Sequence, residues 1–259
     1  MSPELNAASR GPDGEPVVDP RRVVWTVPGS SPRTLRDEPP PIDGRPLVVC
    51  LHGWSSSARD VSAVVDRLGE AVFAAPDGPE PSATPHPGRQ WFALPFGPDG
   101  ALLGTGDPHD GEDDERDRAS RELIERGADG AARAVLAWLD GLAAAATPSS
   151  VSLMGFSQGG ILAMQLLRHA PERFACAALV SGFVVPAPHP GDAVLARRRP
   201  PVFWGRGELD DVIPPLAIEA SDAWLRGHTT LELRSEPTLG HEFSNEMLEA
   251  MRAFYATRI

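Results

Sequence analysis

The strongest constraint on this sequence is the alternation of short apolar runs with segments of helical periodicity. Runs expected to form β-strands lie at 23–27, 46–51, 71–76, 151–156, 175–182, 200–205 and 230–235. Helices are expected at 57–68, 118–145, 161–170, 215–226 and near the C-terminus, where Met247, Leu248, Met251, Phe254 and Tyr255 recur at helical spacing. Strands alternating with helices predict an α/β fold, with a mostly parallel twisted sheet covered by helices on both faces. In such sheets, chemistry is expected at the carboxyl ends of the strands.

The length of 259 residues favours one domain, expected at 21–259. Residues 1–20 are polar and rich in Pro and Gly, so a flexible N-terminal tail is expected there. Residues 97–118 form a polar insertion that contains the acidic stretch 107–117. We expect this insertion to limit access to the site without joining the core. It lacks the regular ligand spacing of a calcium loop.

The charge balance argues against several partners and chemistries. Asp and Glu total 36 against 24 basic residues, which gives a net charge of -12, and no lysine occurs. Negative charge disfavours nucleic acid and anionic membrane surfaces as partners. The absence of lysine excludes Schiff-base and Ser-Lys chemistry on this chain.

The remaining composition favours a cytoplasmic protein. Cys50 and Cys176 lie in apolar runs and are expected to be buried free thiols, which suit a reducing compartment. The first twenty residues lack a basic region followed by an apolar stretch, and no apolar run reaches the ~20 residues of a membrane span. The oligomeric state stays open, with a homodimer as one option.

The segment Gly155-Phe156-Ser157-Gln158-Gly159-Gly160 carries the most specific chemical signal. It has the pattern G-x-S-x-G between an expected strand and an expected helix, which is the context of a nucleophile elbow. The sharp turn holds the serine oxygen in the cleft, and the helix N-terminus favours negative charge beside it. Ser157 is therefore the candidate nucleophile.

A serine nucleophile needs a base, and the base needs an orienting acid. Of seven histidines, only His241 follows an expected strand after a short loop and precedes the last helix, so it is the candidate base. After the strand at 200–205, Glu208, Asp210 and Asp211 compete for the role of the acid, and spacing does not choose among them.

Two backbone N–H groups are expected to bind the oxyanion of an acyl-transfer intermediate. One belongs to Gln158, which follows the nucleophile, and the other to Trp54, in the loop after the strand at 46–51. Gly53 lets this loop approach closely, while His52 is expected to brace it.

Aromatic residues are candidates for an apolar substrate pocket. Trp91 is the strongest of them; the candidates are Trp54, Trp91, Phe92 and Phe96. No metal-ligand spacing, phosphate-binding glycine loop or dinucleotide fingerprint is found, so neither a metal nor a cofactor is expected.

Together these segments resemble the phospholipase/carboxylesterase family of α/β-hydrolases, which includes the acyl-protein thioesterases. The resemblance covers about residues 45–259 and rests on 51–53, 90–92, 155–160, 207–214 and 240–241. In that family the acid lies four residues before a proline, which here implies Asp210 before Pro214. Two departures concern the substrate: Trp54-Ser55 follows His-Gly where smaller residues are usual, and the acidic insertion is long.

The resulting hypothesis is a carboxylesterase-type serine hydrolase that acts on small or medium, uncharged esters through an acyl-enzyme on Ser157. One alternative is a thioesterase, or an acyltransferase or cyclase, that uses the same triad. A second is a catalytically silent binding protein on a hydrolase fold, for which loss of a triad residue would be expected.

Overall fold

The structure is a computed structural model, and it describes residues 8–27, 39–65, 67–82, 88–97, 102–105 and 115–259. Its strands are β1 (Val23–Thr26), β2 (Pro46–Leu51), β3 (Val72–Pro76), β4 (Glu80–Pro81), β5 (Arg89–Gln90), β6 (Ser150–Phe156), β7 (Ala177–Val180), β8 (Pro201–Gly207) and β9 (Thr230–Glu236). Its α-helices are α1 (Ala58–Val65), α2 (Glu115–Ala143), α3 (Gln158–His169), α4 (Asp192–Arg198), α5 (Pro215–His228) and α6 (Asn245–Ala256). A short 3₁₀ turn at Pro20–Arg22 precedes β1.

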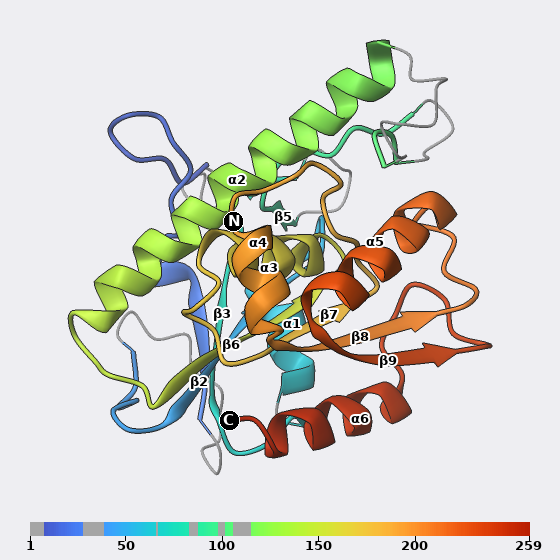
Figure 1. Ribbon diagram of the computed structural model, residues 1–259. Coiled ribbons are helices and arrows are strands. Elements are labelled where there is room, and N and C mark those ends of the chain that lie inside the picture. Colours follow the sequence, from blue (N-terminus) through green and yellow to red (C-terminus); the bar gives the residue numbers. More distant parts are fainter. Residues whose placement is uncertain (1–7, 28–38, 66, 83–87, 98–101, 106–114) are drawn as a thin grey trace.

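A seven-stranded sheet forms the centre of the molecule (Figure 1). Its order is β1-β3-β2-β6-β7-β8-β9, and only β1 runs antiparallel to its neighbour. The expected mostly parallel sheet is therefore confirmed. Because β6, β7, β8 and β9 are adjacent and parallel, the loops that follow them meet along one edge.

Strand pleating divides the buried side chains into two cores. Along β2, Leu47, Val49 and Leu51 enter one core, while Val48 and Cys50 enter the other. The first core is covered by α2, α3, α4 and α5, and the second by α1 and α6, on the opposite face (Figure 1). The inner strands β2, β3, β6, β7 and β8 thus have apolar cover on both sides, which explains their continuous apolar runs, whereas the edge strand β9 is largely exposed.

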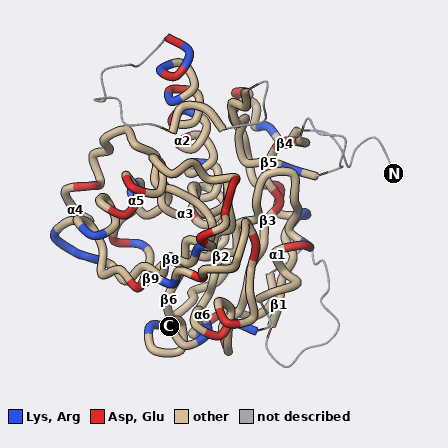
Figure 2. The backbone as a smooth tube through the Cα atoms, turned by 90° about the vertical axis from the view of Figure 1, so that its right-hand side faces the viewer, with Lys and Arg blue, Asp and Glu red and all other residues tan. Residues whose placement is uncertain are grey.

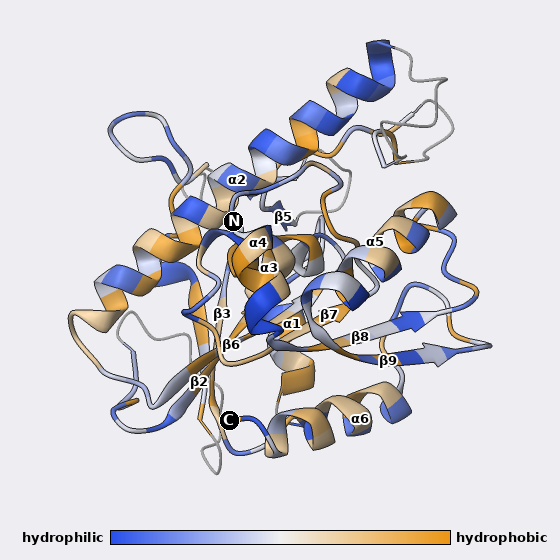
Figure 3. Ribbon diagram, in the orientation of Figure 1, coloured by the Kyte–Doolittle hydropathy of each residue, from blue (hydrophilic) through white to orange (hydrophobic). Residues whose placement is uncertain are grey.

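The α3 helix is buried along its length, in keeping with its hydropathy (Figure 3). It packs against β6 and β7 and under α2. The α2 helix is different: its N-terminal half carries interspersed acidic and basic residues, as Figure 2 shows, and only one stripe faces the core. Such a pattern is typical of a helix on the protein surface.

Three local features differ from the sequence-based expectation. The Pro-rich stretch after β7 contains α4, and β4 pairs with β5 in a small antiparallel ladder. The α3 helix begins at Gln158, directly after the candidate nucleophile, and not at residue 161. Elements as short as α4, β4 and β5 leave little periodicity to read in a sequence.

The described part of the expected tail packs on the domain. The Ser9 N–H donates to the Pro79 carbonyl (2.6 Å), Arg10 forms an ion pair with Glu80, and Val18 is buried in the first core. Residues 8–20 thus contact the domain at several points, which composition does not reveal. The flexibility of the segment 1–20 stays a prediction.

The expected insertion at 97–118 is also partly packed. Leu102 is buried, Thr105 is buried, and the Leu103 N–H donates to the Pro95 carbonyl (2.9 Å). The α2 helix starts at Glu115, so the end of the insertion belongs to that helix. Residues 98–101 and 106–114, with most of the acidic stretch, lie outside the described residues.

Cys50 and Cys176 are free and buried, as expected. Burial raises the pKa of both thiols, which keeps them protonated. Among the described helices, none combines the length and apolar character needed to cross a bilayer.

Candidate active site

Ser157 lies at the turn between β6 and α3, in a strained backbone conformation. Its φ and ψ are 53° and −118°, a region that side chains other than glycine rarely occupy. The Ser157 N–H donates to the carbonyl of Val180 on the neighbouring strand (2.8 Å). Strain fixed by the surrounding strands is typical of functional positions.

The glycines of the elbow allow this turn by removing side chains. A Cβ at Gly155 would lie 2.1 Å from the Gly159 carbonyl oxygen, and a Cβ at Gly159 would lie 2.0 Å from the Leu51 carbonyl oxygen. Both distances are far below contact, so the first turn of α3 can pack on β2 and β6 only with glycine here. The helix N-terminus is thereby held against the turn that carries Ser157.

His241 and Asp210 form a hydrogen-bonded pair beside this turn. The His241 Nδ1 donates to Asp210 Oδ2 (2.9 Å), and the two side chains are 17% and 2% exposed. The other carboxylate oxygen accepts the N–H groups of Val212 (3.0 Å) and Ile213 (3.1 Å). The Asp210 carboxylate is thus fixed by three donors, and His241 Nε2 is left as the nitrogen that can accept a proton.

The same contacts set the ionisation of Asp210. Burial raises the pKa of this carboxyl group. The hydrogen bond from His241, the positive charge of that imidazole and the two backbone N–H donors lower the pKa by more than burial raises it. The net pKa lies below the ordinary value of an aspartate. Asp210 is therefore ionised at neutral pH and able to stabilise a positive imidazolium.

The three carboxylates that compete in the sequence are separated by the fold. Asp211 is exposed, and the Glu208 carboxylate accepts the Ser235 hydroxyl (3.0 Å). Only Asp210 contacts the imidazole of His241. The loops after β8 and β9 are held together by bonds from Glu208 N–H to Glu236 O and from Leu209 N–H to Leu239 O, both 2.9 Å.

Aromatic packing places His241 next to the elbow. Its ring lies 5.1 Å from the ring of Phe156, which directly precedes Ser157, and Phe243 packs on Phe156 at 4.8 Å. The histidine loop therefore docks on the residue before the nucleophile. Neither phenylalanine was singled out from the sequence, although their positions beside Ser157 and His241 are a usable signal.

The loop after β2 approaches Ser157 from the other side. A Cβ at Gly53 would lie 3.4 Å from the Cβ of Ser157 and 3.1 Å from Phe156 Cδ1. Trp54 follows Gly53, and Gln158 is the first residue of α3, where the N–H has no preceding helical carbonyl to bind. The two residues expected to supply the oxyanion donors thus flank the nucleophile.

The side chain of Gln158 has a role that sequence reasoning missed. Its Oε1 accepts the Trp91 N–H (3.0 Å), and its Nε2 donates to the Phe92 carbonyl (2.7 Å). The residue whose backbone follows the nucleophile thereby ties the aromatic loop to α3. Because these contacts join residues 66 and 67 positions apart, no local sequence pattern indicates this role.

Trp91 and Phe92 are buried parts of this loop, at 1% and 4% exposure. The Trp91 indole donates to the His52 carbonyl (2.9 Å), and His52 accepts the Gly78 N–H at Nε2 (2.9 Å) while Nδ1 contacts Gly53 O (2.7 Å). His52 thus braces the loop, as the sequence suggested. The expectation that Trp91 and Phe92 bind substrate stays a prediction, since their contacts here are structural.

Trp54 is half-buried and is the most accessible of the three aromatic residues assigned to substrate binding. Its indole donates to Gln90 Oε1 (2.8 Å), and its ring lies 4.9 Å from that of Phe96, which is 37% exposed. These two rings are therefore accessible from the side of the oxyanion loop.

Backbone strain gathers at this edge of the sheet. Of the four described non-glycine residues with positive φ, three lie here: Ser55 follows β2, Ser157 follows β6 and Ser181 follows β7, while the fourth, Arg199, precedes β8. The Ser181 hydroxyl is buried and has no hydrogen-bond partner among the described residues. Unfavourable groups of this kind are expected where function and not stability shapes the structure.

A mostly parallel sheet with Ser157, Asp210 and His241 in the loops after β6, β8 and β9 defines an α/β-hydrolase. The sequence profile of the phospholipase/carboxylesterase family matches residues 39–259. The chain belongs to this family, and it is therefore a carboxylesterase-type hydrolase.

Individual relatives agree with this assignment. A probable carboxylesterase of Oryza sativa subsp. japonica is 27% identical over 224 residues, which cover 82% of this chain and 88% of that protein. Carboxylesterase SOBER1 of Arabidopsis thaliana is 25% identical over 230 residues, 83% of this chain and 91% of that protein. The crystal structure of esterase PE8 superposes with a TM-score of 0.64 at 26% identity, covering 85% of this chain and 96% of that one.

Proposed function

We propose that this protein hydrolyses carboxylic esters of small or medium, uncharged substrates through an acyl-enzyme on Ser157. The observation that carries the proposal is the hydrogen bond between His241 and the buried Asp210 carboxylate, beside a strained Ser157 at the N-terminus of α3. A serine held this way, with an oriented imidazole at hand, has the parts of an acyl-transfer site.

The proposed reaction has two halves, acylation of Ser157 and hydrolysis of the acyl-enzyme, and the same groups act in both. His241 Nε2 takes the Ser157 hydroxyl proton as the serine oxygen attacks the ester carbonyl, and the N–H groups of Trp54 and Gln158 bind the oxyanion. His241 then gives its proton to the leaving alcohol. In the second half, His241 takes a proton from the water that attacks the acyl-enzyme, and it returns this proton to the Ser157 oxygen as the acid is released. Asp210 keeps the imidazole oriented and stabilises its charged form.

A small cavity beside the elbow supports a limited substrate size. It has a volume of about 200 Å³ and is lined by His52, Gly53, Ser56, Asp60, Val61, Val64, Phe156 and Phe243. Typical ligand pockets are larger, ~300–1,000 Å³, so this one suits a short group. Most of the lining is apolar, and the Asp60 carboxylate disfavours an anion, which together suit an uncharged group.

A fluorophosphonate probe tests the nucleophile. It should label the wild-type protein at Ser157, label Ser157→Ala not at all, and label His241→Ala far more slowly, with far-UV circular dichroism unchanged. The same samples should hydrolyse p-nitrophenyl acetate and butyrate. Labelling that persists in a folded Ser157→Ala protein, or a wild type inert toward both esters, would contradict the proposal.

A panel of esters and acyl thioesters tests the substrate class. Rates should be highest for short, uncharged oxygen esters and should fall with chain length. Phe243→Ala should shift the preference toward longer groups by opening the cavity, while Phe96→Ala, beside Trp54, should shift it less. A larger shift in Phe96→Ala would assign the substrate to the Trp54 side, and faster turnover of matched thioesters would favour a thioesterase.

A further inference from the structure

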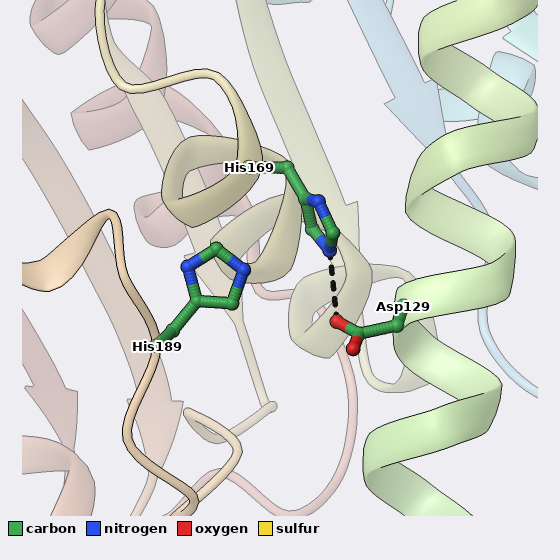
Figure 4. Close-up of side chains that lie close together, drawn as sticks. All are labelled: Asp129, His169 and His189. Carbon is green, nitrogen blue, oxygen red and sulfur yellow. Dashed lines mark hydrogen bonds and ion pairs between the residues drawn. The ribbon is translucent and has the colours of Figure 1, made fainter.

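Three side chains far apart in the sequence converge at the C-terminal end of α3. Asp129 comes from α2, His169 from the last turn of α3, and His189 from the loop before α4 (Figure 4). One potential ligand atom from each lies within 4.8 Å of the other two. All three side chains are half-buried, so solvent reaches the group.

Two of these three side chains are already in contact. His169 Nε2 lies 2.8 Å from Asp129 Oδ1, and Gln165 Nε2 donates to the same oxygen (2.6 Å). The rings of His169 and His189 are 4.6 Å apart. Figure 4 shows a ring nitrogen of His189 turned toward the His169–Asp129 pair. Two imidazole nitrogens and a carboxylate oxygen therefore lie close together.

We propose that Asp129, His169 and His189 bind a divalent transition-metal ion of the zinc type. Zinc bonds to imidazole nitrogen and carboxylate oxygen are ~2.0–2.2 Å long, so tetrahedral donors lie ~3.3 Å apart. The observed separations reach this spacing with small side-chain rotations. Two imidazoles favour zinc, cobalt, nickel or copper over magnesium and calcium, which prefer oxygen ligands alone. Water completes the coordination.

The loop that carries His189 is held firmly enough to present a ligand. The buried Arg168 donates to the carbonyls of Val185 (2.9 Å) and Ala187 (2.5 Å) and pairs with Asp192 (2.8 Å). The Asp192 carboxylate in turn accepts the His189 N–H (3.0 Å). These bonds fix the backbone of His189 relative to α3, which lowers the entropy lost on metal binding.

The charges around the group suit a cation. Asp129 supplies one negative charge, and the charge of Arg168 is balanced by Asp192. Burial, together with the nearby His169 and Arg168, lowers the pKa of His189. Burial raises the pKa of Asp129, but the hydrogen bonds from His169 and Gln165 outweigh burial, so the net pKa lies below the ordinary value of an aspartate.

Metal binding requires two local rearrangements, and the second provides a reporter. The first is at His169, whose Nε2 donates to Asp129 and must lose this proton to bind the ion. The second is at His189. His189 Nδ1 accepts the Gly191 N–H (3.0 Å), so the ring proton of the neutral form lies on Nε2. A metal at Nε2 moves that proton to Nδ1, and the Gly191 bond is then lost. The Gly191 amide should therefore respond to the metal, although it is not a ligand.

The ion would connect α2, α3 and the loop before α4 at a distance from the triad. His169 and Ser157 are at opposite ends of α3, ~18 Å apart at ~1.5 Å per residue. The metal therefore acts on the stability of this region and takes no part in the chemistry of Ser157. The inference does not depend on the proposed esterase activity.

The test is a titration of the metal-free protein with Co²⁺ and Zn²⁺. We expect one ion per chain, visible as d–d absorption of Co²⁺ that Zn²⁺ displaces, and a rise in Tm of about 5 °C at a 100-fold excess over Kd. Asp129→Ala, His169→Ala and His189→Ala should each raise Kd at least ~10-fold. In ¹H–¹⁵N spectra, the Gly191 amide should shift in the wild type on addition of Zn²⁺.

Two matched variants serve as controls: His228→Ala, a histidine stacked on Trp224, and Asp140→Ala, an exposed aspartate of α2. Both should bind the metal as the wild type does. Circular dichroism and hydrolysis of p-nitrophenyl acetate establish that each variant is folded. The inference is overturned if the wild type binds no ion, or if binding survives in His169→Ala and His189→Ala.

Discussion

The two ends of α3 hold their functional side chains by different means. At the N-terminal end, Ser157 is positioned by its own backbone, through positive φ, glycines in contact with β2, and a bond to β7. At the C-terminal end, His169 has ordinary helical geometry, and its partners arrive from α2 and from the loop before α4. One site is therefore built into a contiguous segment, whereas the other exists only after three elements have docked.

The largest expected effect separates the two ends by activity. Ser157→Ala and His241→Ala should each lower kcat/KM for p-nitrophenyl acetate by ~10³-fold or more, because the nucleophile or its base is lost. His169→Ala and His189→Ala should stay within ~2-fold of wild type, since both lie at the far end of α3. Steady-state kinetics on folded variants decides. Near-wild-type turnover in either triad variant would contradict the mechanism.

The next effect distinguishes adjacent carboxylates within the triad region. Asp210→Asn should lower kcat by ~10²- to 10⁴-fold, because an amide does not stabilise the imidazolium of His241. Asp211→Asn should cost little, since Asp211 is exposed. Kinetics on the same ester compares them. A crippled Asp211→Asn beside an active Asp210→Asn would move the acid by one residue.

One added methyl group tests whether the turn that carries Ser157 requires glycine. Gly159→Ala should destabilise the protein by about 3 kcal/mol, because its Cβ would overlap the Leu51 carbonyl oxygen. Gly141→Ala is the matched change in open space on α2 and should stabilise by about 0.5–1 kcal/mol. Urea unfolding measures both. Equal stability of the two variants would mean that the elbow tolerates side chains.

The smallest effect concerns pH and the Asp210–His241 pair. The folded-state pKa of Asp210 lies below the ordinary value, so its ionised form stabilises the fold. This contribution is present above the unfolded pKa of about 3.9 and is lost as the pH falls through the folded pKa. The stability difference between wild type and Asp210→Asn should therefore be more in favour of wild type at pH 6 than at pH 3. Asp211→Asn is the control, and a difference that grows on acidification would contradict the reasoning.

The fold and the elbow could be predicted because their signals are contiguous. Apolar runs report strands buried on both faces, and the pattern at 155–160 fixes the turn and its glycines within six residues. His241 was found in the same way, from its position between the last strand and the last helix. Each of these features depends on neighbours in the chain.

Other features were decided only when distant segments packed together. Residues alone left Glu208, Asp210 and Asp211 open, until the β8 and β9 loops brought one carboxylate to His241. The packing of residues 8–20 and the burial of Trp91 depend on contacts with β-ladder and loop residues remote in sequence.

The group at Asp129, His169 and His189 is the clearest case. No metal-ligand spacing was visible, because these residues are separated by tens of positions and none carries a local motif. A hydrogen bond or a coordination bond depends on separation in space, and parallel packing of helices on a sheet joins residues that no short pattern relates. The sequence by itself determined the sheet and pointed to Ser157 and His241 as the candidate nucleophile and base, and tertiary structure decided which carboxylate meets His241, which aromatic contacts form and which histidines meet.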